Sequence, residues 1–196
     1  MNKYDYSYTD LVISVLRKDA LRLFENFKLA SFDELNVLQA AIELYDKLYD
    51  DMKRKFLLLM KNTCLKVGGK EDDLDEQFLL AFLAEYNPIT EYKFLNEVDR
   101  KRARFEESLI SKESLDPANK ALRLWSNMVS EYAVEFTDRV ALEEYKKYGV
   151  DYLQWITNID GKECDICRDR HKKIYRVREF PGKPHIGCRC KGVPVK

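Results

Sequence analysis

Four cysteines and one histidine near the end of the chain have the spacing of metal ligands. Cys164 and Cys167 form a C-x-x-C pair, and the later segment H-I-G-C-R-C contains His185, Cys188 and Cys190. A tetrahedral zinc ion takes four thiolate or imidazole ligands, and a C-x-x-C pair supplies two of them from one tight turn. Two such groups in one short segment are a much stronger zinc signal than a lone C-x-x-C pair. The spacing therefore predicts a structural zinc site, with a pair of disulfides as the alternative.

The fourth ligand of this site is open between two residues. Cys164, Cys167 and Cys188 belong to every sensible ligand set, and either His185 or Cys190 completes it. Residues one apart in an extended segment point to opposite sides. This alternation favours His185 over Cys190 as the partner of Cys188, and a bend in the chain would remove the argument.

Two other residues of ligand type lie outside this set. His171 sits in a run of charged residues, so it is predicted to be a surface residue rather than a ligand. Cys64 lies far upstream in a helical stretch and is predicted to be a small buried hydrophobe.

Composition indicates a folded chain that has no general attraction to nucleic acid. Of the 196 residues, 45% are hydrophobic and 35% are charged, and Lys+Arg and Asp+Glu both number 34. The formal net charge is therefore zero. The first residues lack the apolar region of a signal peptide, and no apolar run approaches the roughly 20 residues of a membrane helix. We therefore expect synthesis in the cytoplasm and no membrane partner, and clustered reduced thiols favour metal over disulfides.

Helical periodicity dominates the first three-quarters of the chain. Residues 9–27 place apolar side chains on one helical face. A second helix is predicted to open with a capping box of Ser31 and Glu34 and to end at Gly68–Gly69. It carries a heptad seam, which is predicted to pack within the chain rather than against a second copy. The first face comprises Val12, Val15, Leu16, Leu23 and Phe27, and the seam comprises Leu38, Ile42, Tyr45, Tyr49, Met52, Phe56 and Leu59.

Three more helices follow in the prediction. A short one covers residues 71–86 and another covers residues 90–111. The last begins at the N-cap and first-turn pair Asp116–Pro117. It runs to Tyr148 with a possible break near Thr137–Asp138, and Gly149 closes it.

The pattern changes after residue 149. Residues 152–157 and 174–177 are rich in strand-forming types, and Asp160–Gly161 is a turn signal. The fold class is therefore mainly α: a helical bundle (residues 1–148) followed by a small α+β strand-and-loop module (residues 149–196). A module of that size has little core of its own, so a zinc ion would staple it and contribute folding free energy directly.

The module is also basic. From residue 161 to the end there are eleven Lys or Arg and four Asp or Glu, a formal charge of +7. Such a surface could contact phosphate backbone or an acidic protein, and the alternative is an ordinary solvated surface. The candidate contact residues are Arg168, Arg170, Lys172, Lys173, Arg176, Arg178, Arg189 and Lys191.

The same C-terminal residues carry a resemblance to a known family. The pattern W-x-T, D, C-x-x-C and P-H-x-x-C-R-C resembles the phage Mu F-like minor head proteins, also called phage head morphogenesis proteins. The matching residues are Trp155, Thr157, Asp160, Cys164, Cys167, Pro184, His185, Cys188, Arg189 and Cys190. The similarity extends upstream to about residue 90, and over the first 90 residues only helical character is shared.

The resemblance implies a minor capsid protein in the head of a tailed phage. Such proteins are few per particle, associate with the portal, and aid head assembly and DNA packaging or delivery. The implied partners are the portal or the major capsid protein, with packaged DNA as a further contact and no small-molecule substrate. The implied location is the virion. Some relatives carry an additional C-terminal enzyme or toxin domain, which we expect to be absent because only six residues follow Cys190.

Enzymatic readings are weaker. A catalytic zinc keeps an open position beside a carboxylate base, and Glu163 and Asp165 are near in sequence, but a thiolate-rich site is a poor Lewis acid. The zinc-deaminase signature is absent. A Cys167–His185 nucleophile pair is the remaining enzymatic alternative, and Asp160 is better read as shaping a turn. We therefore expect no enzyme. The alternative to a head protein is a free zinc-stabilised nucleic-acid-binding protein.

Overall fold

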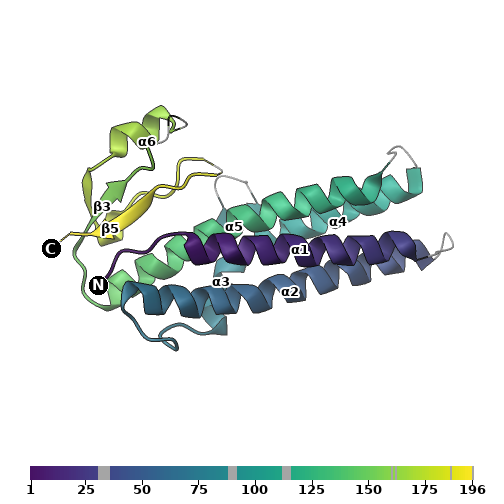
Figure 1. Cartoon of the computed structure of the whole chain (residues 1–196), viewed down its shortest axis with the longest axis horizontal. Coiled ribbons are helices and arrows are strands. Elements are labelled where there is room, and N and C mark those ends of the chain that lie inside the picture. Colours follow the sequence, from purple (N-terminus) through teal and green to yellow (C-terminus); the bar gives the residue numbers. More distant parts are fainter. Residues whose placement is uncertain are drawn as a thin grey trace.

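Four long helices lie side by side in an elongated bundle (Figure 1). The computed structural model describes residues 1–30, 36–87, 92–111, 116–159, 161, 163–185 and 187–195. The bundle consists of α1 (Ser7–Leu29), α2 (Asn36–Val67), α4 (Phe94–Ser111) and α5 (Pro117–Lys147). Successive bundle helices run in opposite directions, and α2 and α5 each contact the other three. The predicted helical bundle is confirmed.

The seam of α2 packs inside the chain, as predicted. Tyr45 meets Trp125 of α5 edge to face at 5.9 Å between ring centroids, and Phe56 stacks on Phe136 at 5.4 Å. The seam is graded in its burial: Tyr45, Met52, Phe56 and Leu59 are buried, and Leu38, Ile42 and Tyr49 are half-buried. Cys64, near the end of α2, is fully buried, as predicted.

The buried face of α1 differs from the predicted one. Val15 is exposed, whereas Ile13, Ala20 and Phe24 are buried. The helix contacts both α2 and α5, so its buried stripe is set by the groove between two helices. Val15 lies outside that groove.

The short helix α3 (Glu76–Ala84) begins later than predicted. Asp75 is its N-cap, and the Asp75 side chain accepts a hydrogen bond from the backbone N–H of Phe78 at 3.2 Å. The cap satisfies an N–H that has no partner inside the helix, and so sets the start of α3. Two-residue strands, β1 (Tyr86–Asn87) and β2 (Tyr92–Lys93), then pair antiparallel, and α4 starts only after them.

Helix α5 is continuous where a break was predicted. Its N-cap Asp116 accepts from the backbone N–H of Asn119 at 3.0 Å. At the expected break, Thr137 donates its hydroxyl to the carbonyl of Ala133 at 2.9 Å, and the helix runs on. It ends as predicted before Gly149, whose φ is +71°.

The C-terminal module contains a three-stranded antiparallel sheet. Its order is β4-β3-β5, so β3 (Tyr152–Ile156) is central, with β4 (Ile174–Arg176) and β5 (Lys191–Pro194) on either side. A short helix, α6 (Asp165–Arg170), and a 3₁₀ turn, η1 (Val177–Glu179), complete it. Neither α6 nor β5 was predicted. The composition of β5 is poor for a strand, and its pairing with β3 is a long-range contact.

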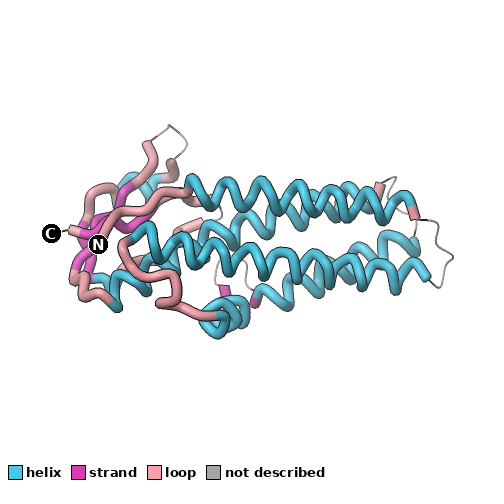
Figure 2. The backbone as a smooth tube through the Cα atoms, turned by 60° about the horizontal axis from the view of Figure 1, so that its bottom comes forward, coloured by secondary structure: helices cyan, strands magenta, loops and turns pink. Residues whose placement is uncertain are grey.

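The module lies at the end of the bundle where α1 begins and α5 ends (Figures 1 and 2). An apolar cluster there joins the N-terminal residues, two bundle helices and the sheet. Its buried members are Tyr4, Val67, Ala141, Tyr145, Leu153 and Val177. The boundary after residue 148 stays a prediction, and this cluster is the contact that docks the two parts.

Two predicted features fall on residues that the structure does not describe. The capping box of Ser31 and Glu34 lies outside the described residues, and so does Asp160. No helix in the described part of the chain combines the length and apolarity needed to cross a bilayer.

Candidate metal centre

The C-x-x-C pair lies at the start of α6 rather than in a simple turn. Cys164 is the N-cap of α6, and its sulfur accepts a hydrogen bond from the backbone N–H of Cys167 at 3.4 Å. Cys167 is in the first turn and is 1% exposed. Both sulfurs therefore lie at a helix N-terminus, which favours negatively charged groups.

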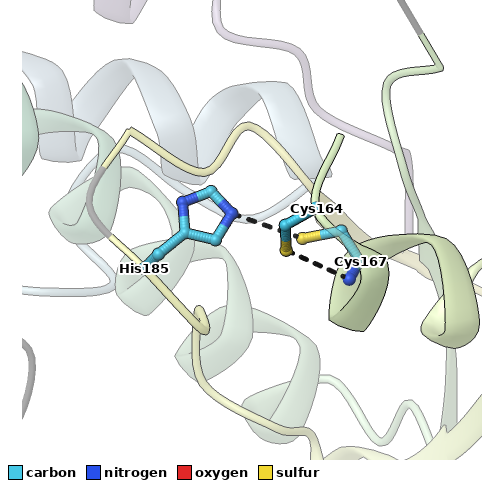
Figure 3. A group of neighbouring side chains, drawn as sticks. All are labelled: Cys164, Cys167 and His185. Atoms are coloured by element: carbon cyan, nitrogen blue, oxygen red, sulfur yellow. Dashed lines mark hydrogen bonds between the residues drawn. The ribbon is translucent and has the colours of Figure 1, made fainter. Parts of the chain in front are cut away.

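The candidate ligands of the later segment, His185, Cys188 and Cys190, lie close to Cys167. The sulfur of Cys167 lies 3.7 Å from Nε2 of His185 and 3.6 Å from the sulfur of Cys188. Figure 3 shows the side chains of Cys164, Cys167 and His185 directed toward one another. Two sets of donor atoms each lie within 4.8 Å of one another: Cys164, Cys167 and His185 form one set, and Cys167, Cys188 and Cys190 the other.

The alternation argument against Cys190 is wrong. The sulfurs of Cys188 and Cys190 lie on the same side of the chain, within 4.8 Å of each other, and both residues are buried. Gly187, with a φ of +75°, precedes them, and β5 starts only at Lys191. The segment is therefore bent rather than extended, and the side-to-side alternation of a strand does not apply.

The spacing of the donor atoms suits a tetrahedral metal with sulfur ligands. Metal–sulfur bonds of about 2.3 Å place two tetrahedral donors about 3.7 Å apart. The two separations from Cys167, 3.6 Å and 3.7 Å, match that value. All five cysteines are free thiols in this structure. The cluster is positioned to bind a metal ion.

The four thiols of the cluster differ in acidity. A hydrogen bond from Cys188 lowers the pKa of Cys190 to about 5, and the same bond raises the pKa of Cys188. The backbone N–H of Cys167 lowers the pKa of Cys164, whereas burial raises that of Cys167 to about 12. The cluster thus holds protons, which a metal ion would displace when it binds.

Two residues beneath the cluster link it to the sheet. The hydroxyl of Thr157 donates to the carbonyl oxygen of Cys167 at 2.7 Å and accepts from Nε1 of Trp155 at 3.1 Å. Phe180 stacks on Trp155 at 5.4 Å between ring centroids. Trp155 and Thr157 of the W-x-T pattern therefore support the backbone of Cys167, a candidate ligand.

His171 contributes to this support instead of lying free on the surface. It is half-buried, and its Nδ1 accepts the backbone N–H of Thr157 at 3.2 Å. It belongs to neither set of candidate ligands. The prediction of a surface residue rather than a ligand therefore holds in part: the ring is half-buried, because this hydrogen bond joins it to a segment 14 residues away.

Sequence reasoning missed Lys183 and Asp138. Lys183 donates to the carbonyl oxygens of Cys188 at 2.7 Å and of Cys190 at 3.0 Å, and it forms an ion pair with Asp138 at 2.7 Å. Nothing in the local pattern P-G-K-P marks this lysine, and Asp138 is one of many acidic residues on α5. Their pairing spans 45 positions in the chain, so only the folded structure brings it out.

The eight basic candidate residues divide into three groups. Three are bound into the fold: Arg170 lies over the ring of Trp155 and donates to Gly182, Arg189 pairs with Asp10, and Lys191 donates to Tyr4. Arg168 is exposed and pairs with Glu163 and Asp165. The other four are exposed on or beside β4: Lys172, Lys173, Arg176 and Arg178. The structure thus places only part of the predicted basic set on the surface.

Comparison with known proteins adds no relative: the chain matches no protein-family model, no curated protein and no solved structure.

Proposed function

We propose that the chain is a portal-associated minor head protein of a tailed phage, whose C-terminal module is held together by a structural zinc ion. The observation that carries the proposal is the convergence of the motif residues. Residues from three separate segments, Trp155 with Thr157, Cys164 with Cys167, and His185 to Cys190, meet in one cluster. Those are the residues on which the resemblance to phage head morphogenesis proteins rests.

Zinc is the ion that this donor set suits best. Thiolates and imidazole are its usual structural ligands, and four of them close its tetrahedron. Cys164, Cys167 and Cys188 are proposed as three ligands. His185 completes the proposed set, with Cys190 as the alternative, and the bent loop presents both to Cys167.

A structural role for the ion is supported by the burial of the cluster. Cys167, Cys188 and Cys190 are all buried, and a nucleophile or an open metal position must be reached by substrate. The Cys167–His185 pair could serve as a nucleophile and base by distance, but Cys167 is only 1% exposed. The site therefore supports a closed staple better than a reaction centre.

The shape of the protein suits a connecting role in an assembly. The bundle is elongated, and it carries the compact module at the end where both termini lie (Figure 2). The long helices would offer surface to the portal or the major capsid protein. The exposed residues Lys172, Lys173, Arg176 and Arg178 would face packaged DNA.

The alternative is a free zinc-stabilised nucleic-acid-binding protein. Four of the eight basic candidates pair within the fold, which leaves fewer cations to neutralise phosphates. We therefore favour the head protein. Mass spectrometry of purified particles and of assembling heads from the encoding phage should detect its peptides. Absence from both, together with binding to free DNA that weakens steeply with salt, would establish the alternative instead.

The zinc is tested by native mass spectrometry of the purified chain with and without a strong chelator. The expected result is one zinc ion per chain, lost on chelation together with the order of the module. A chain that carries no metal after purification with added zinc would contradict the proposed structural zinc ion.

A further inference from the structure

Lys183 lies between the candidate metal loop and helix α5. Its side chain is 11% exposed. Its ammonium group lies within 3.0 Å of four oxygens, those of Asp138, Tyr6 and the carbonyls of Cys188 and Cys190. A lysine has three N–H donors and no acceptor, so these neighbours use all of its hydrogen-bonding capacity.

The two carbonyls belong to the two cysteines that enter the cluster from the C-terminal side. By binding both, Lys183 fixes the backbone on either side of Arg189 and thereby the direction of the two sulfurs. It also places a positive charge beside thiols that would be thiolates around a metal. A site with three or four thiolates carries a net charge of about −1 to −2, and a nearby ammonium offsets part of it.

Asp138 in turn holds Lys183. One oxygen of its carboxylate pairs with Lys183, and the other accepts hydrogen bonds from the hydroxyls of Tyr4 and Tyr6. The Tyr6 hydroxyl also lies 3.1 Å from the carbonyl of Cys190. Hydrogen bonds of Lys183 therefore connect the loop to both α5 and the N-terminal segment.

We propose that Lys183, oriented by Asp138, is the positioning residue of the metal loop, so that metal affinity depends on the docking of the module against α5. This inference rests on the proposed zinc site. Removing a group that orients ligands costs metal sites about 10- to 100-fold in affinity, and we expect a loss of that size here.

The test measures zinc affinity of the full chain by competition with a chromophoric chelator. Lys183→Met keeps the apolar stem and should weaken binding 10- to 100-fold, whereas Lys183→Arg keeps the charge and should recover part of the loss. Lys191→Met is the matched control. This lysine is in the same segment and contacts the Tyr4 carbonyl, and its removal should change affinity by less than about threefold.

Two further measurements separate positioning from simple destabilisation. The electronic spectrum of the Co²⁺ form reports ligand geometry and should shift in Lys183→Met and stay unchanged in Lys191→Met. Asp138→Asn should weaken binding as well, and the double variant with Lys183→Met should lose little more than the single one, because both act through one link.

The outcomes are distinguishable. If the unmodified chain binds neither zinc nor Co²⁺, the proposed metal centre fails. If it binds and Lys183→Met binds equally well with the same spectrum, the inference about Lys183 is wrong. If Lys183→Met does not fold even with excess zinc, the zinc affinities and Co²⁺ spectra of Lys183→Arg and Asp138→Asn are compared with those of Lys191→Met. Weaker binding and a shifted spectrum in the first two support the inference, and no difference contradicts it.

Discussion

The bundle and the C-terminal module each bury one tryptophan, and the surroundings of the two rings differ. Trp125 in α5 lies among apolar and aromatic side chains and meets Tyr45 edge to face. Trp155 in β3 stacks on Phe180 and is tied by its N–H to Thr157, which in turn binds a cysteine of the cluster. The core around Trp125 draws buried residues from five helices, whereas the core around Trp155 consists largely of cysteines.

This difference predicts how each part responds to the loss of one group. In the bundle, many apolar contacts share the free energy of folding, so one truncation weakens it without removing it. In the module, the buried cluster consists of one tryptophan and three cysteines. Its order therefore depends on whether those cysteines are held together.

The largest effect is expected from Cys167→Ser. Cys167 belongs to both sets of candidate ligands, so its loss should abolish metal binding and unfold the module while the helices persist. Far-UV circular dichroism should retain its helical signal, and Trp155 fluorescence, read in a Trp125→Phe background, should become that of an exposed ring. Cys64→Ala is the control. Loss of the helical signal would contradict the two-part architecture.

A large effect confined to the bundle is expected from Phe136→Ala. Phe136 is fully buried and packs against Phe56 and Phe82. Removing such a ring costs about 3–5 kcal/mol of unfolding free energy. Denaturant unfolding followed by far-UV circular dichroism measures it, and zinc stoichiometry of the folded variant should be unchanged. Leu58→Ala, at a residue 56% exposed, should cost less than about 0.5 kcal/mol.

A pH-dependent effect is expected at Glu144 of α5. Its carboxyl group is fully buried, and burial, together with the negatively charged carboxylate of Asp73, raises its pKa to about 7. The folded protein therefore holds this proton more tightly than the unfolded chain, whose glutamate has a pKa of about 4.3. The stability contributed by the protonated group is complete below about pH 4.3 and is lost as pH rises to about 7.

Glu144→Gln keeps a neutral side chain at every pH and tests this sign. At pH 8 the variant should be more stable than the parent by about 3–4 kcal/mol, and at pH 4 the two should differ little. Thermal unfolding across pH 4–8 is the measurement, and Glu143→Gln at the half-buried neighbour is the control. An equal change at both pH values would mean that the proton on Glu144 is not involved.

The smallest effect is expected from Thr157→Val beneath the cluster. The change leaves the carbonyl of Cys167 and the N–H of Trp155 without their shared partner. Loss of such hydrogen bonds costs about 1–1.5 kcal/mol, or about tenfold in zinc affinity. Competition with a chelator measures it. Thr157→Ser retains the hydroxyl and should restore most of the affinity. If the valine variant binds zinc as tightly as the parent, the Thr157 hydrogen bonds do not contribute to zinc affinity.

Much of the bundle was predictable because its signals are local. The cap at Asp116, the end of α5 before Gly149 and the seam of α2 all follow from residues within one or two turns of one another. Where local signals were ambiguous the prediction failed. Residues before Asp75 were assigned to α3 and a break was placed in α5, because neither the competing cap nor the packing on both sides can be read from a short window.

The candidate site was predicted in part for the same reason. The residue types and spacing between Cys164 and Cys190 identify the soft donors without any knowledge of the fold. The direction of the Cys190 sulfur depends on a bend at Gly187 and on the hydrogen bond from Lys183 to the Cys190 carbonyl. Sequence periodicity encodes neither of them.

The sequence by itself thus determined the long helices of the bundle and the composition of the donor set, since both depend on neighbours along the chain. The tertiary structure decided the rest: the strand β5, the pairing of Lys183 with Asp138, and the docking of Tyr4 and Tyr6 against the module. The physical reason is distance along the chain. Tyr6 and Cys190 are 184 positions apart, and their contact forms only when bundle and sheet pack together.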